Sequence, residues 1–302
     1  MKIIIRVCIC FIVIITINGG CKSVMVTGKT PQKLEMLRQQ CAISSDPEFA
    51  DLLGRNKHNP HIVAPPAWRS LLVTLAPFRF DLTFGIVRNR EDLKFFWFCG
   101  EFGTRGTPQE VLAAIQKLLR QKGFTARPVR HTEYGTDEYA FRKQENGLEH
   151  LLIVEGVERF VGSREPHCGG SLRYEISIPS AGTPPTVEEI LAVFPELRCP
   201  ELPQNLADFF KNRAFSLLSY GGTWTRYYSW QLDIGGDSAS NTADLFKQVE
   251  TIILGSGFSL EKTDRGVSVY QNPDLHEPIF YLRLDKNTAG NTVFSFRIQP
   301  HT

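Results

Sequence analysis

Two amphipathic helices, each followed by strand-like runs, are the feature that most constrains the fold of this chain. The first is predicted to begin at Thr107-Pro108-Gln109-Glu110, where a threonine N-cap, a proline and a glutamate form a capping box. The second is predicted to begin at Asn241-Thr242-Ala243-Asp244, with asparagine as its cap. In both, the following apolar residues fall on one helical face, and Gly123 and Gly257 follow the ends.

The two helices align without a gap at an offset of 134 residues, and their flanks align as well. A short helix and a strand pair are predicted before each long helix, and the strand nearest the helix is at residues 95–99 in the first copy and 226–234 in the second. Three strands are predicted after each helix: residues 138–142, 150–160 and 172–178 in the first copy, and 266–271, 279–285 and 292–298 in the second. Few residues are identical between the copies, so the shared pattern is the evidence for a tandem duplication. The alternative is two ordinary domains whose amphipathic elements resemble one another.

The element order predicts an α+β fold. Tight connections between successive strands favour antiparallel hairpins, and each long helix would pack on one face of its sheet. We therefore expect two similar modules, at residues 45–180 and 181–302. The linker between them is predicted at Pro179–Pro185, where small residues and prolines cannot extend the preceding strand.

The strand at residues 95–99, Phe-Phe-Trp-Phe-Cys, is apolar on both faces. Its counterpart alternates, with Tyr228, Trp230 and Leu232 on one face and polar residues on the other, which is typical of a half-buried strand. The second face of the first strand therefore needs a cover. The candidates are residues 65–75, the second module or an external partner, and cover from within the chain is the expectation.

The first twenty residues are predicted to be a signal peptide. Lys2 and Arg6 form a basic start, and an apolar run covers residues 7–17. This run is shorter than the roughly 20 apolar residues that cross a bilayer, and small residues follow it. We therefore expect export from the cytoplasm.

Asn18-Gly19-Gly20-Cys21 resembles the lipobox of bacterial lipoproteins, in which a cysteine becomes the acylated N-terminus. Asn18 departs from that pattern, because an aliphatic residue is usual there. The resemblance implies lipid attachment at Cys21 and stable anchoring to the cell envelope through several acyl chains. The alternative is ordinary cleavage with a free Cys21. Lys22, where an aspartate would favour the inner membrane, points to the outer membrane, and residues 21–44 would form a tether.

The composition bears on the core, on the class of partner and on disulfides. The chain has 302 residues, of which 42% are hydrophobic and 22% charged, so a packed core is expected rather than disorder. Without Lys2 and Arg6, the mature chain has 32 basic and 32 acidic residues, which argues against a nucleic-acid partner bound through charge. Export permits disulfides, and the candidate cysteines are Cys41, Cys168 and Cys199, whereas Cys99 suits a buried free thiol.

The sequence contains no HExxH, CxxC, GxSxG or Walker motif, so no catalytic residue, metal or cofactor is predicted. Trp224 and Tyr227 are candidate binding residues, because exposed aromatics can anchor a protein or stack on sugars. The sequence therefore favours a non-enzymatic envelope lipoprotein that is held at the membrane by its N-terminal lipid and binds a protein partner or a cell-surface polymer. The alternative is an exported hydrolase with an unrecognised active site.

Overall fold

The structure is a computed structural model with an α+β fold. It describes residues 30–43, 47–54, 62–75, 80–89, 92–133, 135–159, 167–178, 185–213, 215–221, 227–233, 239–274, 278–286 and 292–299. The predicted signal peptide, Cys21, Trp224 and residues 179–184 of the predicted linker lie outside these ranges. Below, the first half means residues 30–178 and the second half residues 185–299.

Most helices are short, and the two predicted long ones are present. The bounds are α1 Thr30–Gln40, α2 Pro47–Gly54, α3 Pro66–Leu75, α4 Pro108–Gln121, α5 Val187–Val193, η1 Pro195–Leu197 (a 3-10 helix), α6 Gln204–Phe210 and α7 Ala239–Gly255. The capping box of α4 is confirmed, since the Thr107 hydroxyl accepts the Glu110 N–H and the Glu110 carboxylate accepts the Thr107 N–H. The predicted start of α7 is wrong by three residues, because the helix begins at Ala239 and the predicted cap, Asn241, lies inside its first turn.

The described strands form one large antiparallel sheet and one small pair, β1 Ala42–Ile43 with β2 Val63–Ala64. The large sheet has 13 strands in the order β12-β13-β14-β15-β11-β10-β3-β4-β9-β8-β7-β5, with β6 beside β7. Their bounds are β3 Phe80–Asn89, β4 Asp92–Arg105, β5 Thr125–Ala126, β6 Arg130–His131, β7 Asp137–Glu145, β8 Leu148–Arg159, β9 His167–Ile178, β10 Phe215–Gly221, β11 Tyr227–Asp233, β12 Ser259–Asp264, β13 Val267–Gln271, β14 Ile279–Lys286 and β15 Thr292–Gln299. The two halves join through β3 and β10, which the sequence did not predict.

Each half orders its strands in the same way from this junction outward. The first half runs β3-β4-β9-β8-β7-β5, and the second runs β10-β11-β15-β14-β13-β12. The long helix follows the second strand in both, as α4 and α7. The register also corresponds, since Trp97 lies opposite Tyr174 across β4 and β9, and Trp230 lies opposite Phe296 across β11 and β15.

The six strands predicted after the two helices are confirmed, with ends that differ from the prediction by up to five residues, as at the start of β9. The strands that were not predicted include β5 and β12, which directly follow the long helices and add a further strand to each half. Both have exposed side chains throughout, so neither has the alternating pattern that marks a half-buried strand.

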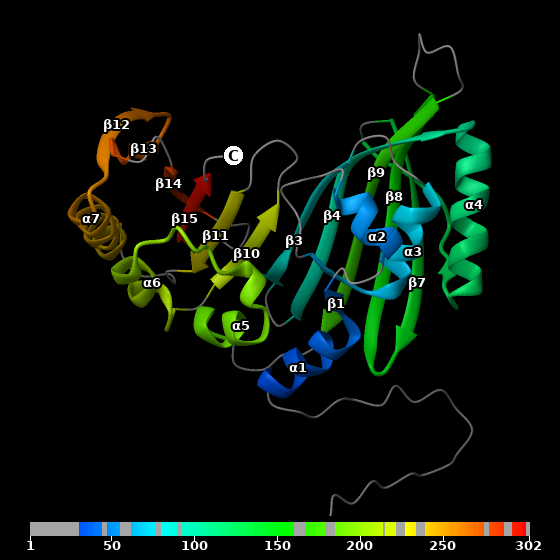
Figure 1. Cartoon of the computed structure of the whole chain (residues 1–302), viewed down its shortest axis with the longest axis horizontal. Coiled ribbons are helices and arrows are strands. Elements are labelled where there is room, and N and C mark those ends of the chain that lie inside the picture. Colours follow the sequence, from blue (N-terminus) through cyan, green and yellow to red (C-terminus); the bar gives the residue numbers. More distant parts are fainter. Residues whose placement is uncertain are drawn as a thin grey trace, which may run out of the picture.

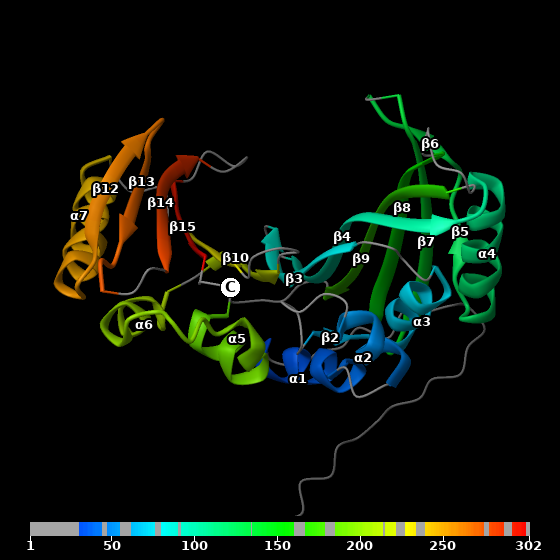
Figure 2. The same ribbon diagram turned by 45° about the horizontal axis from the view of Figure 1, so that its top comes forward.

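The helices cover one face of the sheet and leave the other without a helix among the described residues (Figures 1 and 2). In Figure 2 the sheet is curved, with β3 and β10 at its lowest part and α1, α2, α3, α5 and α6 beneath it. The face without helices is therefore the concave one. Between helices and sheet lies a continuous core whose largest fully buried side chains include Trp68, Trp97, Tyr174, Trp230 and Tyr270.

Helix α1 ties the two halves together. Leu34 and Leu37 are fully buried, and the Arg38 guanidinium lies 2.7 Å from the Glu196 carboxylate of η1 and over the Phe194 ring. Residues 30–40, which fall in the segment predicted as a tether, thus form a packed helix.

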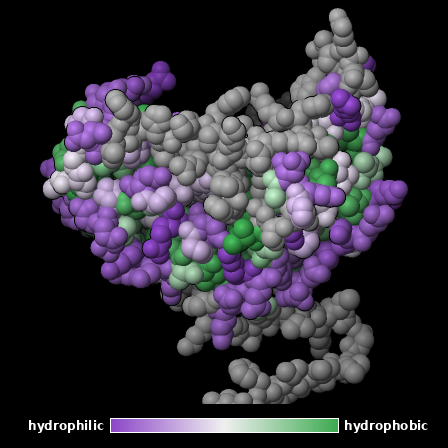
Figure 3. Space-filling model, viewed as in Figure 1, coloured by the Kyte–Doolittle hydropathy of each residue, from purple (hydrophilic) through white to green (hydrophobic). Residues whose placement is uncertain are grey.

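One face of the molecule can be compared by hydropathy among its described residues. In the view of Figure 1, hydrophobic residues form only small patches separated by hydrophilic ones (Figure 3). No helix in the described part of the chain has the length and apolar character needed to span a membrane.

Candidate functional site

The concave face of the sheet is the candidate functional site, and we call it the helix-free face. Every second residue of its strands points to this side, while the residues between them are buried under the helices. Its central positions are Thr83, Gly85 and Val87 of β3, Lys94, Phe96 and Phe98 of β4, Arg173, Glu175 and Ser177 of β9, Leu217, Ser219 and Gly221 of β10, Tyr227, Ser229 and Gln231 of β11, and Ser295 and Arg297 of β15.

One row of these residues crosses both halves of the sheet. Tyr227, Gly221, Thr83, Phe98 and Arg173 lie directly opposite one another on β11, β10, β3, β4 and β9. Three strand spacings separate Tyr227 from Phe98, which is about 14 Å. The row therefore places two aromatic side chains on opposite sides of the junction between the halves.

Tyr227 is the one predicted binding residue within the described ranges. Its side chain makes two contacts, one through the hydroxyl and one through the ring. Its hydroxyl lies 2.6 Å from the Thr83 hydroxyl, two strands away. It can reach across β10 because Gly221 has no side chain there, and a Cβ at Gly221 would lie 2.5 Å from Thr83 Oγ1. The Arg297 guanidinium lies 4.1 Å from the centre of the Tyr227 ring, in cation–π geometry.

The neighbouring row brings small residues together at the junction. Ser229, Ser219 and Gly85 lie opposite one another, and Phe96 and Glu175 continue the row on β4 and β9. A Cβ on Gly85 would lie 2.4 Å from the Leu218 carbonyl oxygen and 2.7 Å from the Ser219 Cβ. Glycine at position 85 therefore permits the close approach of β3 and β10.

Three charged residues, Lys94, Arg173 and Glu175, lie next to Phe96 and Phe98 on the helix-free face. The Glu175 carboxylate lies 3.2 Å from Lys94 Nζ and 3.1 Å from Arg173 Nε. The Arg173 side chain is 47% exposed, so its guanidinium retains donors that face solvent. The Glu175 side chain is only 13% exposed and faces two cations, so this cluster keeps one net positive charge.

Phe98 is 39% exposed, more than any other phenylalanine, tyrosine or tryptophan whose side chain the structure describes. On the same strand Phe95, Trp97 and Cys99 are buried, and Trp97 donates its indole N–H to the Val63 carbonyl. The helices thus cover one face of β4 completely. The expectation that the chain also covers the other face is wrong for Phe98.

The other predicted site residues are not brought together with Tyr227. Cys21 and Trp224 lie outside the described residues. Cys41, Cys168 and Cys199 are buried free thiols in the structure, at the end of α1, in β9 and after η1. Their pairing in a disulfide stays a prediction.

The roles of Arg173 and Arg297 and the Thr83–Tyr227 contact could not be predicted from the sequence, because they depend on which strands are neighbours in the sheet. It did single out the strand that carries Phe98, from its apolar character on both faces. Among the described residues, no cluster of three or more histidine, cysteine, aspartate or glutamate side chains could hold a metal ion. Comparison with family models, with curated proteins and with solved structures finds no significant match to this chain.

Proposed function

We propose that this chain is a non-enzymatic binding protein that holds a protein partner on its helix-free face. The exposure of Phe98 carries the proposal, because a phenylalanine on a helix-free sheet face leaves apolar surface in water. Contact with a partner would remove that surface from water. Arg173 lies directly opposite Phe98, and arginine and aromatic residues are the types enriched in protein interfaces.

The charges of the helix-free face favour a protein over a charged polymer. Lys94, Arg173 and Arg297 are interspersed with Glu175 and with several serines. A polyanion would meet the Glu175 carboxylate, whereas a protein surface can present complementary groups of both signs. The concave shape suits a convex partner surface (Figure 2).

We further propose that the protein is located in the bacterial cell envelope. The predicted signal peptide and the lipobox-like Cys21 support a lipid-anchored protein of the bacterial envelope, on the outer membrane. Replacing Cys21 with serine is expected to move the mature protein from the membrane to the soluble fraction. Unchanged fractionation of the Cys21→Ser variant would contradict the anchor and leave the binding proposal standing.

Photocrosslinking in the native cell tests the binding proposal. A photoreactive phenylalanine analogue would replace Phe98 on the helix-free face. In the matched control it would replace Leu254, an exposed apolar residue of α7. We expect a discrete protein adduct from position 98 that weakens in the Arg173→Ala background. Equal adduct yields from both positions, or none from position 98, would overturn the proposal.

We also infer that the two halves arose from one duplicated module. The identical strand order and the matching positions of Trp97 and Trp230 opposite Tyr174 and Phe296 support this. An experimental structure in which the second half orders its strands differently would contradict it.

A further inference from the structure

One end of the large sheet carries an excess of positive charge, and we call this surface the basic edge. It consists of the second half of α4, the edge strands β5 and β6 and the residues between them. It lies at the opposite end of the molecule from α7 (Figures 1 and 2). Residues 111–132 contain five lysine and arginine residues and no aspartate or glutamate. The five are Lys117, Arg120, Lys122, Arg127 and Arg130, and all five side chains are exposed.

Four of these five cations have no ion-pair partner among the described residues, and Arg127 is the exception. The Arg127 guanidinium lies 3.4 Å from the Glu149 carboxylate of β8. With the flanking Glu110 and Glu133 included, residues 110–133 contain five basic and two acidic residues. The basic edge therefore presents positive charge to solvent, although the mature chain is formally neutral.

The cations lie on both sides of this end of the sheet. Lys117 and Arg120 are exposed on α4, whose buried side faces the sheet. Arg127 instead contacts Glu149, which lies opposite Ser177 on the helix-free face. A flat surface that meets this end of the molecule would therefore contact cations from both the helix layer and the sheet layer.

An apolar side chain lies among the cations of the basic edge. Val129 is 47% exposed and lies between Arg127 and Arg130, in the connection from β5 to β6. Segments that bind membrane surfaces combine these two kinds of side chain, because cations attract anionic lipids and apolar groups enter the boundary between headgroups and acyl chains. A soluble polyanion would gain nothing from an exposed valine. Val129 therefore favours a membrane as the partner of this surface.

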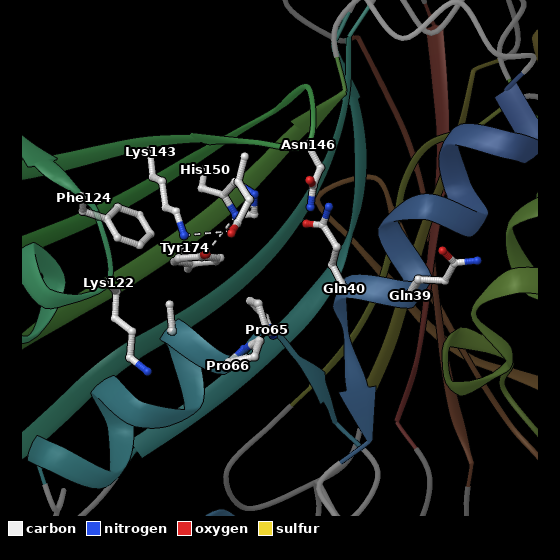
Figure 4. A pocket seen from close by; sticks show the side chains of 12 residues that line it. Gln39, Gln40, Pro65, Pro66, Lys122, Phe124, Lys143, Asn146, His150 and Tyr174 are labelled. Carbon is white, nitrogen blue, oxygen red and sulfur yellow. Dashed lines mark hydrogen bonds and ion pairs between the residues drawn. The ribbon is translucent and has the colours of Figure 1, made fainter. Parts of the chain in front are cut away.

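The position of α1 would let a lipid anchor at Cys21 and the basic edge reach the same membrane. Gln40, at the end of α1, lines the same cavity as Lys122 (Figure 4). Helix α1 is about 16 Å long, and the nine residue steps from Cys21 to Thr30 can span about 30 Å. This step rests on the proposed lipid attachment, whereas the charge of the basic edge and the exposure of Val129 do not.

We propose that the basic edge binds the surface of a membrane that contains anionic phospholipids. Its lysines and arginines contact lipid phosphates, and Val129 enters the boundary between headgroups and acyl chains. Phe98 stays clear of this contact, because it lies on β4, three strand spacings or about 14 Å from β7. A membrane-bound chain thus keeps the centre of its helix-free face accessible to a protein partner.

Co-sedimentation of the mature Cys21→Ser chain with lipid vesicles tests the basic edge in the absence of acyl chains. The probes are vesicles of phosphatidylethanolamine with phosphatidylglycerol, and vesicles of phosphatidylcholine alone. We expect the chain to bind only the anionic vesicles. Binding should weaken as the salt rises from about 0.1 M to about 1 M, because the Debye length falls from about 10 Å to about 3 Å.

Two triple variants with the same change in net charge locate the contact. The first removes three cations of the basic edge and the second removes three from the second half, and all six side chains are exposed. The first variant combines Arg120→Gln, Lys122→Gln and Arg130→Gln, and the second combines Arg198→Gln, Lys247→Gln and Lys262→Gln. At about fivefold for each cation, the first should bind anionic vesicles roughly 100-fold more weakly. The second should bind like the parent chain, and thermal unfolding checks that both are folded.

A fluorescent amino acid that responds to its environment reports which residues meet the lipid. Placed at position 129, it should shift to the blue on anionic vesicles. Placed at Leu254 of α7, which is 46% exposed, it should not shift. Equal vesicle affinity of the two triple variants, or equal shifts at the two positions, would overturn the proposal. Binding of soluble polyphosphate by a chain that does not bind vesicles would also overturn it.

A salt wash separates this proposal from the lipid anchor. At about 1 M salt the basic edge alone should no longer hold the Cys21→Ser chain on membranes. Fractionation at high salt therefore tests the anchor, and vesicle binding at low salt tests the basic edge.

Discussion

The hydroxyls of Thr83 and Tyr227 lie 2.6 Å apart, although one belongs to the first half of the chain and the other to the second. Tyr227 lies on β11 and reaches over Gly221 of β10 to a residue of β3. The contact therefore spans the junction where the two halves become one sheet. The helix-free face is continuous across that junction only if β3 and β10 stay closely paired.

Substitution of Gly85 by alanine tests this close pairing. The added Cβ would lie 2.4 Å from the Leu218 carbonyl oxygen, which is backbone and cannot rotate away. We expect Gly85→Ala to lower the free energy of unfolding by about 1–3 kcal/mol in urea denaturation. The matched control is Gly255→Ala at the end of α7, where nothing lies within 4 Å of the added carbon. Equal stability of the two variants would show that the junction is looser than described.

The buried histidine predicts a pH dependence of stability. The pKa of His150 falls from 6.5 to about 4 because burial disfavours the imidazolium. Between these values the unfolded chain binds a proton that the folded chain does not, so stability falls as the pH drops from 6.5 to 4. The His150 contribution to this loss reaches about 3 kcal/mol, and above pH 6.5 it vanishes.

Urea denaturation of the parent chain and of His150→Phe across this pH range isolates that contribution. The phenylalanine keeps a ring at the site and removes the titration. We expect the stability difference between the two proteins to change with pH between 6.5 and 4. A difference that stays constant would mean that His150 titrates alike in both states.

The cysteines give a third prediction. Burial raises the pKa of the Cys41 thiol to about 12, against a smaller opposing effect of Arg38, and it raises the pKa of Cys199 well above 9.0. Because the thiolate is the reactive form, native protein should react slowly with iodoacetamide at pH 8. In denaturant without reductant, Cys41, Cys99, Cys168 and Cys199 should all be alkylated, as peptide mass spectrometry would show. Disulfide-linked peptides would instead establish the pairing that export permits.

Local signals predicted a large part of the fold. The capping box at Thr107 located α4, and alternation along residues 172–178 and 292–298 located β9 and β15. Short polar strands such as β12 were missed, because their side chains are exposed on both faces. The start of α7 was misplaced because asparagine caps are a preference among several residues that can occupy that position.

The candidate site could be predicted only in part. The residues of the strand at 95–99 already indicated an apolar face without a partner, and Phe98 lies on that face. The pairing of β3 with β10, and the hydrogen bond between His150 and Tyr174, depend on contacts between distant segments. No local pattern in the sequence encodes such contacts.

The central claim is that Phe98 anchors a protein partner on the helix-free face. The direct measurement is the affinity of the crosslinked partner, once isolated, for the parent chain and for Phe98→Ala and Leu254→Ala variants. We predict that Phe98→Ala binds at least about tenfold more weakly, while Leu254→Ala binds like the parent chain. Equal affinity of all three proteins would contradict the claim.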